Sequence, residues 1–209
     1  PIGDRHRIGQ GSKRKRRDAF MKHAVSQDLY AYWQERRGNR LAPERADIAP
    51  GPIRHLLSDV FILALDREAG HPFRLAGTRL CALFGRELKG ERFIELWAAA
   101  NATIVSNLLA IAADEQVGTV AGVTGQMANG DAIELELLLL PLAATRSNLA
   151  RAIGVMVPLK TPEWLGVNAI SALTIGPRRH VGATIEVRRL PRLVRPLQRR
   201  LTVVQGDRG

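Results

Sequence analysis

Residues 117–142, VGTVAGVTGQMANGDAIELELLLLPL, decide the fold. Asn129–Gly130 in the middle of this stretch is a strong hairpin signal, because a two-residue turn of type I′ needs positive φ at both positions. After the turn, apolar residues alternate with glutamates, which is the period of a strand with one wet face near the turn. The alternating positions are Ile133, Glu134, Leu135, Glu136, Leu137, Leu138 and Leu139. The stretch therefore predicts two antiparallel strands, at 117–126 and 133–140.

Three further strands are predicted on either side of this hairpin. Residues 60–65, VFILAL, form an apolar run of β-favouring side chains, and a turn-forming segment separates them from a second short run at 73–76. Downstream, residues 150–157 form a last apolar strand that ends at Pro158. Together these signals predict one five-stranded antiparallel sheet.

The segment between the strand pairs has a helical pattern. Residues 80–97 read as short helices interrupted by Gly85 and Gly90, and residues 98–116 read as the longest helix of the chain. Strands followed by helices and then by more strands indicate an α+β fold, in which the helices of 80–116 cover one face of the sheet.

A further helix, at 26–37, is predicted to precede the sheet. Ser26 is the expected N-cap and Gly38 the stop. Because an isolated helix of about twelve residues is marginal in water, it must pack either on its own sheet or on a second copy of the chain. We favour the second copy, and hence a homodimer. The apolar stripe that would make this contact consists of Leu29, Tyr32 and Trp33.

The positive charge of the chain lies at its two ends. The whole chain has 31 Lys and Arg against 20 Asp and Glu. Residues 1–22 hold eight basic and two acidic residues, residues 178–209 hold nine and two, and the middle is close to neutral. We therefore expect a basic tail at 1–22, a folded domain at 23–165 and a second basic tail at 166–209.

The C-terminal tail also has an apolar stripe at helical spacing, interrupted by Pro196. Three interpretations remain open for it. The segment is a disordered arginine-rich end, or it contacts an anionic membrane or an acidic partner, or it binds nucleic-acid phosphates. The residues of the stripe are Leu190, Leu193, Val194, Leu197 and Leu201.

Several classes of protein are excluded by composition. A single cysteine rules out a disulfide scaffold, and the five scattered histidines indicate no metal site. No apolar run approaches the ~20 residues of a membrane span, and the start does not resemble a signal peptide, so we expect a cytoplasmic protein. No catalytic motif occurs, and we interpret Glu134 and Glu136 as a solvated face. We therefore expect no enzymatic activity.

The segment GTRLCALFGRELKG at 77–90 resembles the PAS superfamily in the part that follows its second strand, where a leucine–x–glycine step precedes a Glu–Leu–x–Gly step. More narrowly, the chain resembles a family of single-PAS-domain proteins known mainly from alphaproteobacteria. The resemblance covers roughly residues 28–165. The narrower match lies in Tyr32–Trp33, Leu41–Ala42–Pro43, Arg45–Ala46–Asp47–Ile48, Pro50, Ile53–Arg54–His55–Leu56–Leu57 and Phe73–Arg74–Leu75–Ala76–Gly77–Thr78.

The resemblance implies a sensing or interaction role, and it allows the usual cofactors to be tested against the residues. The Asn–Cys–Arg motif of flavin-binding members is absent, and we interpret Cys81 as a small buried hydrophobe. The long helix has no histidine to ligate haem. We therefore expect neither flavin nor haem. What remains is a core-filled domain or a pocket for an unidentified small ligand between the long helix and the sheet. Its candidate residues are Arg74, Phe84, Trp97, Ile104, Asn107, Leu108 and Ile111.

Arg74 has two interpretations. On a strand among apolar neighbours its charge needs a partner, and Asp47 or Glu87 could form a structural ion pair with it. The alternative is an anion clamp in the pocket.

Three functions follow in order of preference. The first is a stand-alone PAS sensor or adaptor that binds a small molecule or a signalling protein in bacteria. The alternative is a basic-tailed protein that binds nucleic acid or an anionic membrane surface. An enzyme comes last.

Overall fold

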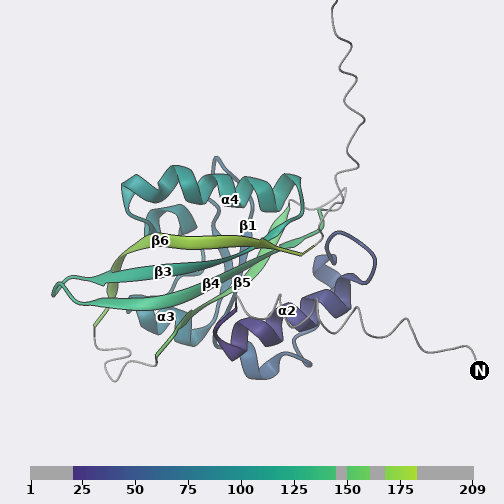
Figure 1. The fold of residues 1–209 in the computed structure, drawn as a ribbon, viewed down its shortest axis with the longest axis horizontal. Helices are drawn as coiled ribbons and strands as arrows, with labels where there is room; N and C mark the ends of the chain where they lie inside the picture. Colours follow the sequence, from purple (N-terminus) through teal and green to yellow (C-terminus); the bar gives the residue numbers. More distant parts are fainter. Residues whose placement is uncertain (1–20, 145–149, 161–167, 183–209) are drawn as a thin grey trace, which may run out of the picture.

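One antiparallel sheet organises the molecule (Figure 1). The computed structural model describes residues 21–144, 150–160 and 168–182. The sheet has six strands in the order β2-β1-β5-β4-β3-β6, and each pair of neighbours is antiparallel. The predicted α+β fold with an antiparallel sheet is confirmed. The strands are β1 (Val60–Ala64), β2 (Phe73–Ala76), β3 (Gly118–Met127), β4 (Ala132–Leu142), β5 (Arg151–Pro158) and β6 (Ile170–Val181).

The sheet has one strand more than the five predicted. β6 lies in the segment that was assigned to the C-terminal tail at 166–209, so that assignment is wrong for the residues of this strand. The strand pattern of β6 is hard to recognise in the sequence, because Gly176 and Pro177 interrupt it and basic residues follow. Proline is tolerated here because β6 is an edge strand, where one N–H can be missing. The remaining predictions for the basic tails, with nucleic acid or a membrane as partner, fall at 1–20 and 183–209, outside the described residues.

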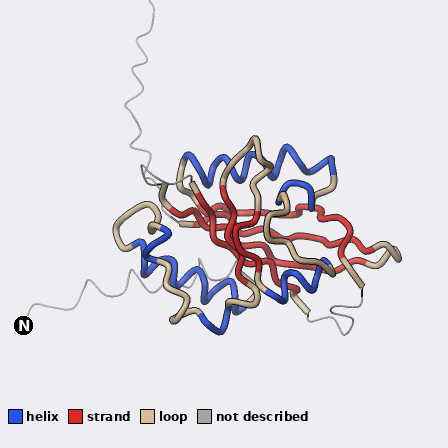
Figure 2. Tube along the Cα trace, turned by 180° about the vertical axis from the view of Figure 1, so that it is seen from behind, coloured by secondary structure: helices blue, strands red, loops and turns tan. Residues whose placement is uncertain are grey.

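Helices lie on both faces of the sheet (Figure 2). On one face are α3 (Thr78–Phe84), the short 3-10 helix η3 (Phe93–Leu96) and α4 (Ala102–Asp114), as predicted. On the other face is α2 (Ala24–Arg37). Every residue of β1 is buried, because Phe61 and Leu63 point toward the α4 side and Val60 and Ile62 point toward the α2 side.

The N-terminal helix packs on its own sheet, which is one of the two arrangements considered. Trp33 is fully buried, and its indole Nε1 donates a hydrogen bond to the Pro141 oxygen of β4 at 2.8 Å. Leu29 and Tyr32 are also buried against this face. The stripe expected to form a dimer contact is therefore covered within one chain.

Helix α2 begins earlier than predicted. Its N-cap is His23, whose Nδ1 accepts a hydrogen bond from the Val25 amide at 3.2 Å. Ser26, the predicted cap, lies inside the first turn and is fully buried. The expected stop at Gly38 is correct, since this residue has φ of 55°. The sequence pattern predicts the wrong start for α2, because an imidazole can cap a helix as a serine hydroxyl does, although serine is the more frequent cap.

Replacing Trp33 tests how much α2 contributes to stability. Trp33→Ala is expected to lower the free energy of unfolding by about 3–5 kcal/mol, because it leaves a large cavity between helix and sheet. Trp33→Phe keeps a ring and removes the hydrogen bond to Pro141, so its effect should be smaller. Urea denaturation measures both. An unchanged midpoint for Trp33→Ala would contradict the packing of α2 described above.

Candidate functional site

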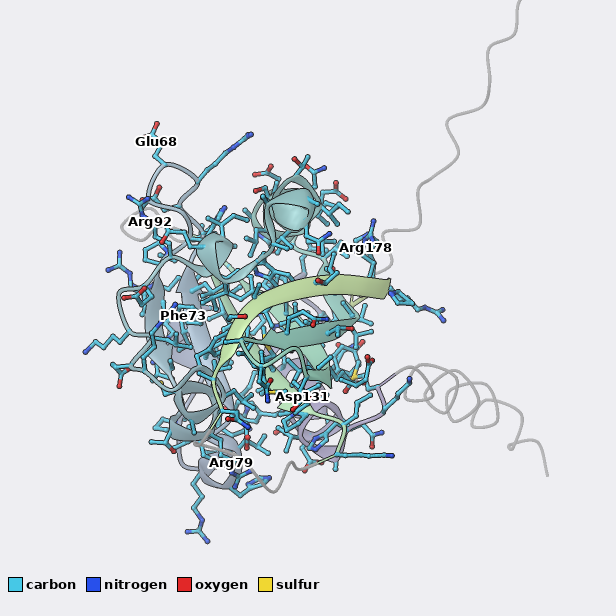
Figure 3. All side chains as sticks on the ribbon, turned by 90° about the vertical axis from the view of Figure 1, so that its left-hand side faces the viewer. Glu68, Phe73, Arg79, Arg92, Asp131 and Arg178 are labelled. Carbon is cyan, nitrogen blue, oxygen red and sulfur yellow. The ribbon has the colours of Figure 1, made fainter. Side chains whose placement is uncertain are left out.

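Four aromatic rings pack together in the core on the α4 side of the sheet. Phe61, Phe73, Phe93 and Trp97 form a cluster with ring centroids 5.6–5.8 Å apart. Phe73 lies inside the molecule among other side chains (Figure 3). The Nε1 atom of Trp97 is buried and has no hydrogen-bond partner among the described residues.

Only some of the predicted pocket residues lie together in the interior. Phe84, Trp97 and Leu108 are buried in the core on the α4 side, and Ile104 and Ile111 are half-buried. Asn107 and Arg74 are exposed. The buried residues among them are part of the core on the α4 side of the sheet, and a small-ligand pocket there stays a prediction.

Arg74 forms neither of the predicted ion pairs. Asp47 instead pairs with Arg40 at 2.8 Å, and Glu87 accepts hydrogen bonds from Cys81 and Lys89. Arg74 has no salt bridge within the described parts of the chain, because it is exposed on the edge strand β2 and needs no partner there.

Cys81 is half-buried on α3, and its Sγ donates to the Glu87 carboxylate at 3.5 Å. Burial, reinforced by the neighbouring carboxylate, raises the pKa of the Cys81 thiol. A reactive cysteine needs the opposite shift, toward the thiolate. The environment of Cys81 is that of a structural residue.

A cavity of about 500 Å³ opens on the other face of the sheet, over β4, β3 and β6. These strands lie side by side, and α2 follows the β5 side of the sheet (Figure 1). Helix α2 therefore leaves this part of the face uncovered. The cavity is lined by Lys22, Val120, Ala121, Gly122, Glu134, Leu135, Glu136, Leu159, Pro177, Arg178 and Arg179.

Glu136 is buried at the border between this cavity and α2, with an exposed fraction of 3%. Its Oε2 accepts a hydrogen bond from the Lys22 amide at 2.6 Å, and its Oε1 accepts one from the His23 amide at 3.2 Å. These N–H groups belong to the chain entering α2, where a helix favours negative charge. The interpretation of Glu136 as part of a solvated face is wrong, because α2 brings backbone donors to the sheet.

Acidic and basic side chains lie on opposite sides of β3 in this cavity. Glu134 on β4 is exposed, and its Oε1 accepts from the Thr124 hydroxyl at 3.2 Å. Arg179 on β6 pairs with Val120, a residue of the core on the α2 side, so its side chain lies on the cavity face.

The neighbouring Arg178 pairs with Ala121 of the opposite core, so its side chain points toward the α4 side. In Figure 3, Arg178 and Arg92 lie on opposite sides of the molecule.

The sequence profile of the PAS domain family matches residues 21–157, about two thirds of the chain. The chain belongs to the PAS domain family. No curated protein matches the sequence.

Solved structures resemble this PAS domain weakly. A light-oxygen-voltage domain studied with a flavin analogue has 13% identity and a TM-score of 0.41, with 56% of this chain and 86% of that chain covered. The light-oxygen-voltage protein of Rhodobacter sphaeroides has 13% identity and a TM-score of 0.40, covering 51% and 61%. The PAS domain of an HTR-like protein from Haloarcula marismortui has 15% identity and a TM-score of 0.37, covering 69% and 98%. Membership therefore rests on the family profile.

Neither a membrane-spanning helix nor a cluster of metal ligands occurs in the described part of the PAS domain. No helix there is both long and apolar enough to cross a bilayer. No group of three or more His, Cys, Asp or Glu side chains is placed there to hold a metal ion.

Because Glu136 accepts two backbone amides and Glu134 accepts none from the described residues, we expect replacement of Glu136 to destabilise the domain more than replacement of Glu134. Glu136→Gln replaces one acceptor oxygen by an NH₂ group that faces an N–H donor, so the free energy of unfolding should fall by about 1–3 kcal/mol. Hydrogen exchange at the start of α2 should become faster. Glu134→Gln, two residues away on the same strand face, is the matched control and should change neither quantity. Equal effects of the two variants would contradict the role of Glu136.

Proposed function

We propose that this PAS domain is a sensor or adaptor that works by binding a signalling protein and has no catalytic activity of its own. The observation that carries the proposal is the part of the α2-side face, over β3, β4 and β6, that no described helix covers, which we call the open face. Sheets bury their apolar faces against other layers, and an uncovered part is available to a partner. The exposed residues of the open face are Gln126, Ala132, Glu134, Thr174 and Arg179.

Both edges of the sheet already have hydrogen-bond partners at some positions, which supports a contact through the face. On β6, the Leu173 oxygen accepts from the Ala98 amide at 2.9 Å, and the Ile175 amide donates to the Asn101 side chain at 3.0 Å. Pro177 then removes a further donor. On β2, both backbone groups of Phe73 bond to the segment at 90–91. Addition of a partner strand at these positions is therefore disfavoured.

The packing of the α4 side supports a domain that needs no chromophore. Four aromatic rings pack against one another in this core, and Cys81 lacks the low pKa of a reactive thiol. Signalling would then depend on contacts at the surface of the domain and would use neither flavin nor haem.

The cofactor expectation is tested by the absorption spectrum and the native mass of the purified full chain. The spectrum should show only aromatic side chains, and the mass should equal that of the polypeptide. The indole ¹H–¹⁵N signal of Trp97 should be single, because one packed state is expected around it. A coloured preparation that keeps its chromophore through dialysis would overturn the expectation.

The partner surface is tested with a photo-crosslinking amino acid placed at one of two threonines. Thr174 lies on the open face, and Thr103 is exposed on α4 on the opposite side of the sheet. In cells of the organism that encodes the chain, the Thr174 variant should form a defined adduct with a second protein and the Thr103 variant should not. Adducts of equal yield at both positions, or adducts at Thr103 alone, would contradict the proposed surface.

A further inference from the structure

We propose that the cavity on the open face binds an organic monocation, in which one ammonium group is attached to an apolar body of several carbon atoms. This inference goes beyond the proposed function, because it assigns a small-ligand site that needs no partner protein. The cavity volume of about 500 Å³ lies within the ~300–1,000 Å³ range of ligand sites. It is larger than an ammonium group alone requires, so the ligand needs a body as well as a charge.

Glu134 is the side chain of the cavity that is left to receive a cation. Its Oε1 accepts a hydrogen bond from the Thr124 hydroxyl at 3.2 Å, and its carboxylate forms no ion pair with any described residue. Both oxygens of Glu136 already accept the amides of Lys22 and His23. A carboxylate with free acceptor positions forms charge-assisted hydrogen bonds with an ammonium group, which are stronger than neutral ones.

The basic residues around the cavity do not take this role from the ligand. Arg178 points toward the α4 side of the sheet. Arg179 already interacts with another group, so we assign it no part in binding. Lys22 is held beside Glu136 by the hydrogen bond of its amide and offsets the charge of that glutamate. Glu134 is therefore the glutamate of the cavity without a counter-charge among the described residues.

The floor of the cavity has room for a flat body next to this charge. Gly122 of β3 pairs with Glu136, which lies two residues along β4 from Glu134. Two residues of a strand correspond to about 7 Å, so Gly122 lies one short linker away from the level of the acceptor. An added Cβ at Gly122 would have Pro177 atoms as its nearest neighbours, at 3.8–3.9 Å, so the glycine leaves space above the sheet.

Apolar residues line the cavity at both ends of this floor. Leu159 lies beside the charged end, because its amide donates to the Glu134 backbone oxygen at 2.9 Å. Val120, two residues beyond Gly122 on β3, lines the other end. A ring joined to the ammonium through two carbon atoms can lie over Gly122 between these residues, and the burial of its apolar surface adds to the affinity.

The test is a ¹H–¹⁵N NMR titration of the full chain with 2-phenylethylamine, which carries one positive charge at neutral pH. It should give saturable shifts at Gly122, Thr124 and Glu134. The Trp97 indole signal, which reports on the interior, should stay unchanged. Shifts centred on Trp97, or no saturation by about 10 mM, would overturn the proposal.

Two relatives of this probe test the choice of a monocation. 2-Phenylethanol has the same body without the charge, and phenylalanine adds a carboxylate beside the ammonium. Each should bind about three- to tenfold more weakly than the amine, because the first loses the ionic hydrogen bond and the second brings a negative charge toward Glu134. An affinity of either compound equal to that of the amine would contradict the assigned ligand class.

A pair of charge variants tests the acceptor. Glu134→Gln should make 2-phenylethylamine bind as weakly as 2-phenylethanol does. Glu115→Gln makes the same change at an exposed position at the end of α4, on the opposite side of the sheet, and should leave the affinity unchanged. Equal losses in the two variants would show a long-range charge effect and would overturn the site.

Gly122→Val tests the cavity while both of its glutamates are kept. The domain should fold as before, with an unchanged urea midpoint, because a Cβ at this position meets only ordinary contacts. The added methyl groups fill the floor, so the amine and the alcohol should both bind about tenfold more weakly or less. Unchanged binding of the amine would place it elsewhere and would refute the proposal. The titrations need no partner protein, so their outcome is independent of the crosslinking experiment.

Discussion

Strand β1 carries apolar side chains on both of its faces, and the rest of the structure depends on covering both. Its neighbour β5 is buried along nearly its whole length for the same reason. Helices α3 and α4 cover one side, and on the other side α2 packs together with the segment that carries Ile48, Ile53 and Leu56. One helix is narrower than a six-stranded sheet. Among the described residues, α2 and this segment cover β1, β5 and the part of β4 that holds Leu138 and Leu140, and the face around Thr124 and Thr174 stays open.

The attachment of α2 combines an apolar and a polar contact at its two ends. Near its C-terminal end, Trp33 fills the space over β4 and donates to Pro141. At its N-terminal end, the chain donates two amides to Glu136. A buried carboxylate without partners would be costly, so Glu136 and the helix entry stabilise each other. The cavity lies next to this second contact, because Lys22 and Glu136 both line it.

The two sides of the sheet have different physical characters. On the α4 side, aromatic rings in edge and stacked contacts make a dense core with few polar atoms. On the open face, small residues such as Gly122 and Thr124 lie between charged side chains. A dense core makes the domain rigid. The open face is polar and partly hollow, and its side chains offer the directional hydrogen bonds that recognition requires.

Local patterns in the sequence determined much of the fold. The Asn129–Gly130 turn, the alternation after it, the apolar run of β1 and the stop at Gly38 each depend on neighbouring residues only, so the sequence was enough for them. Phe84, Trp97 and Leu108 were predicted to line a pocket or to fill the core beside the long helix, and they are buried there. The PAS resemblance, which the family profile confirms, also lies in short motifs.

Only the tertiary structure decided what depends on distant residues. Glu136 looks solvated from its alternation, yet it is buried by donors 114 and 113 positions away in the chain. β6 forms a strand, although Gly176 and Pro177 interrupt it, because β3 supplies its hydrogen-bond partners. Helix α2 could have met its own sheet or another copy, and only the uncovered apolar face of β1 and β5 selects the sheet. Arg74 needs no counter-ion because β2 is an edge strand, and strand order is a property of the assembled sheet that no local pattern contains.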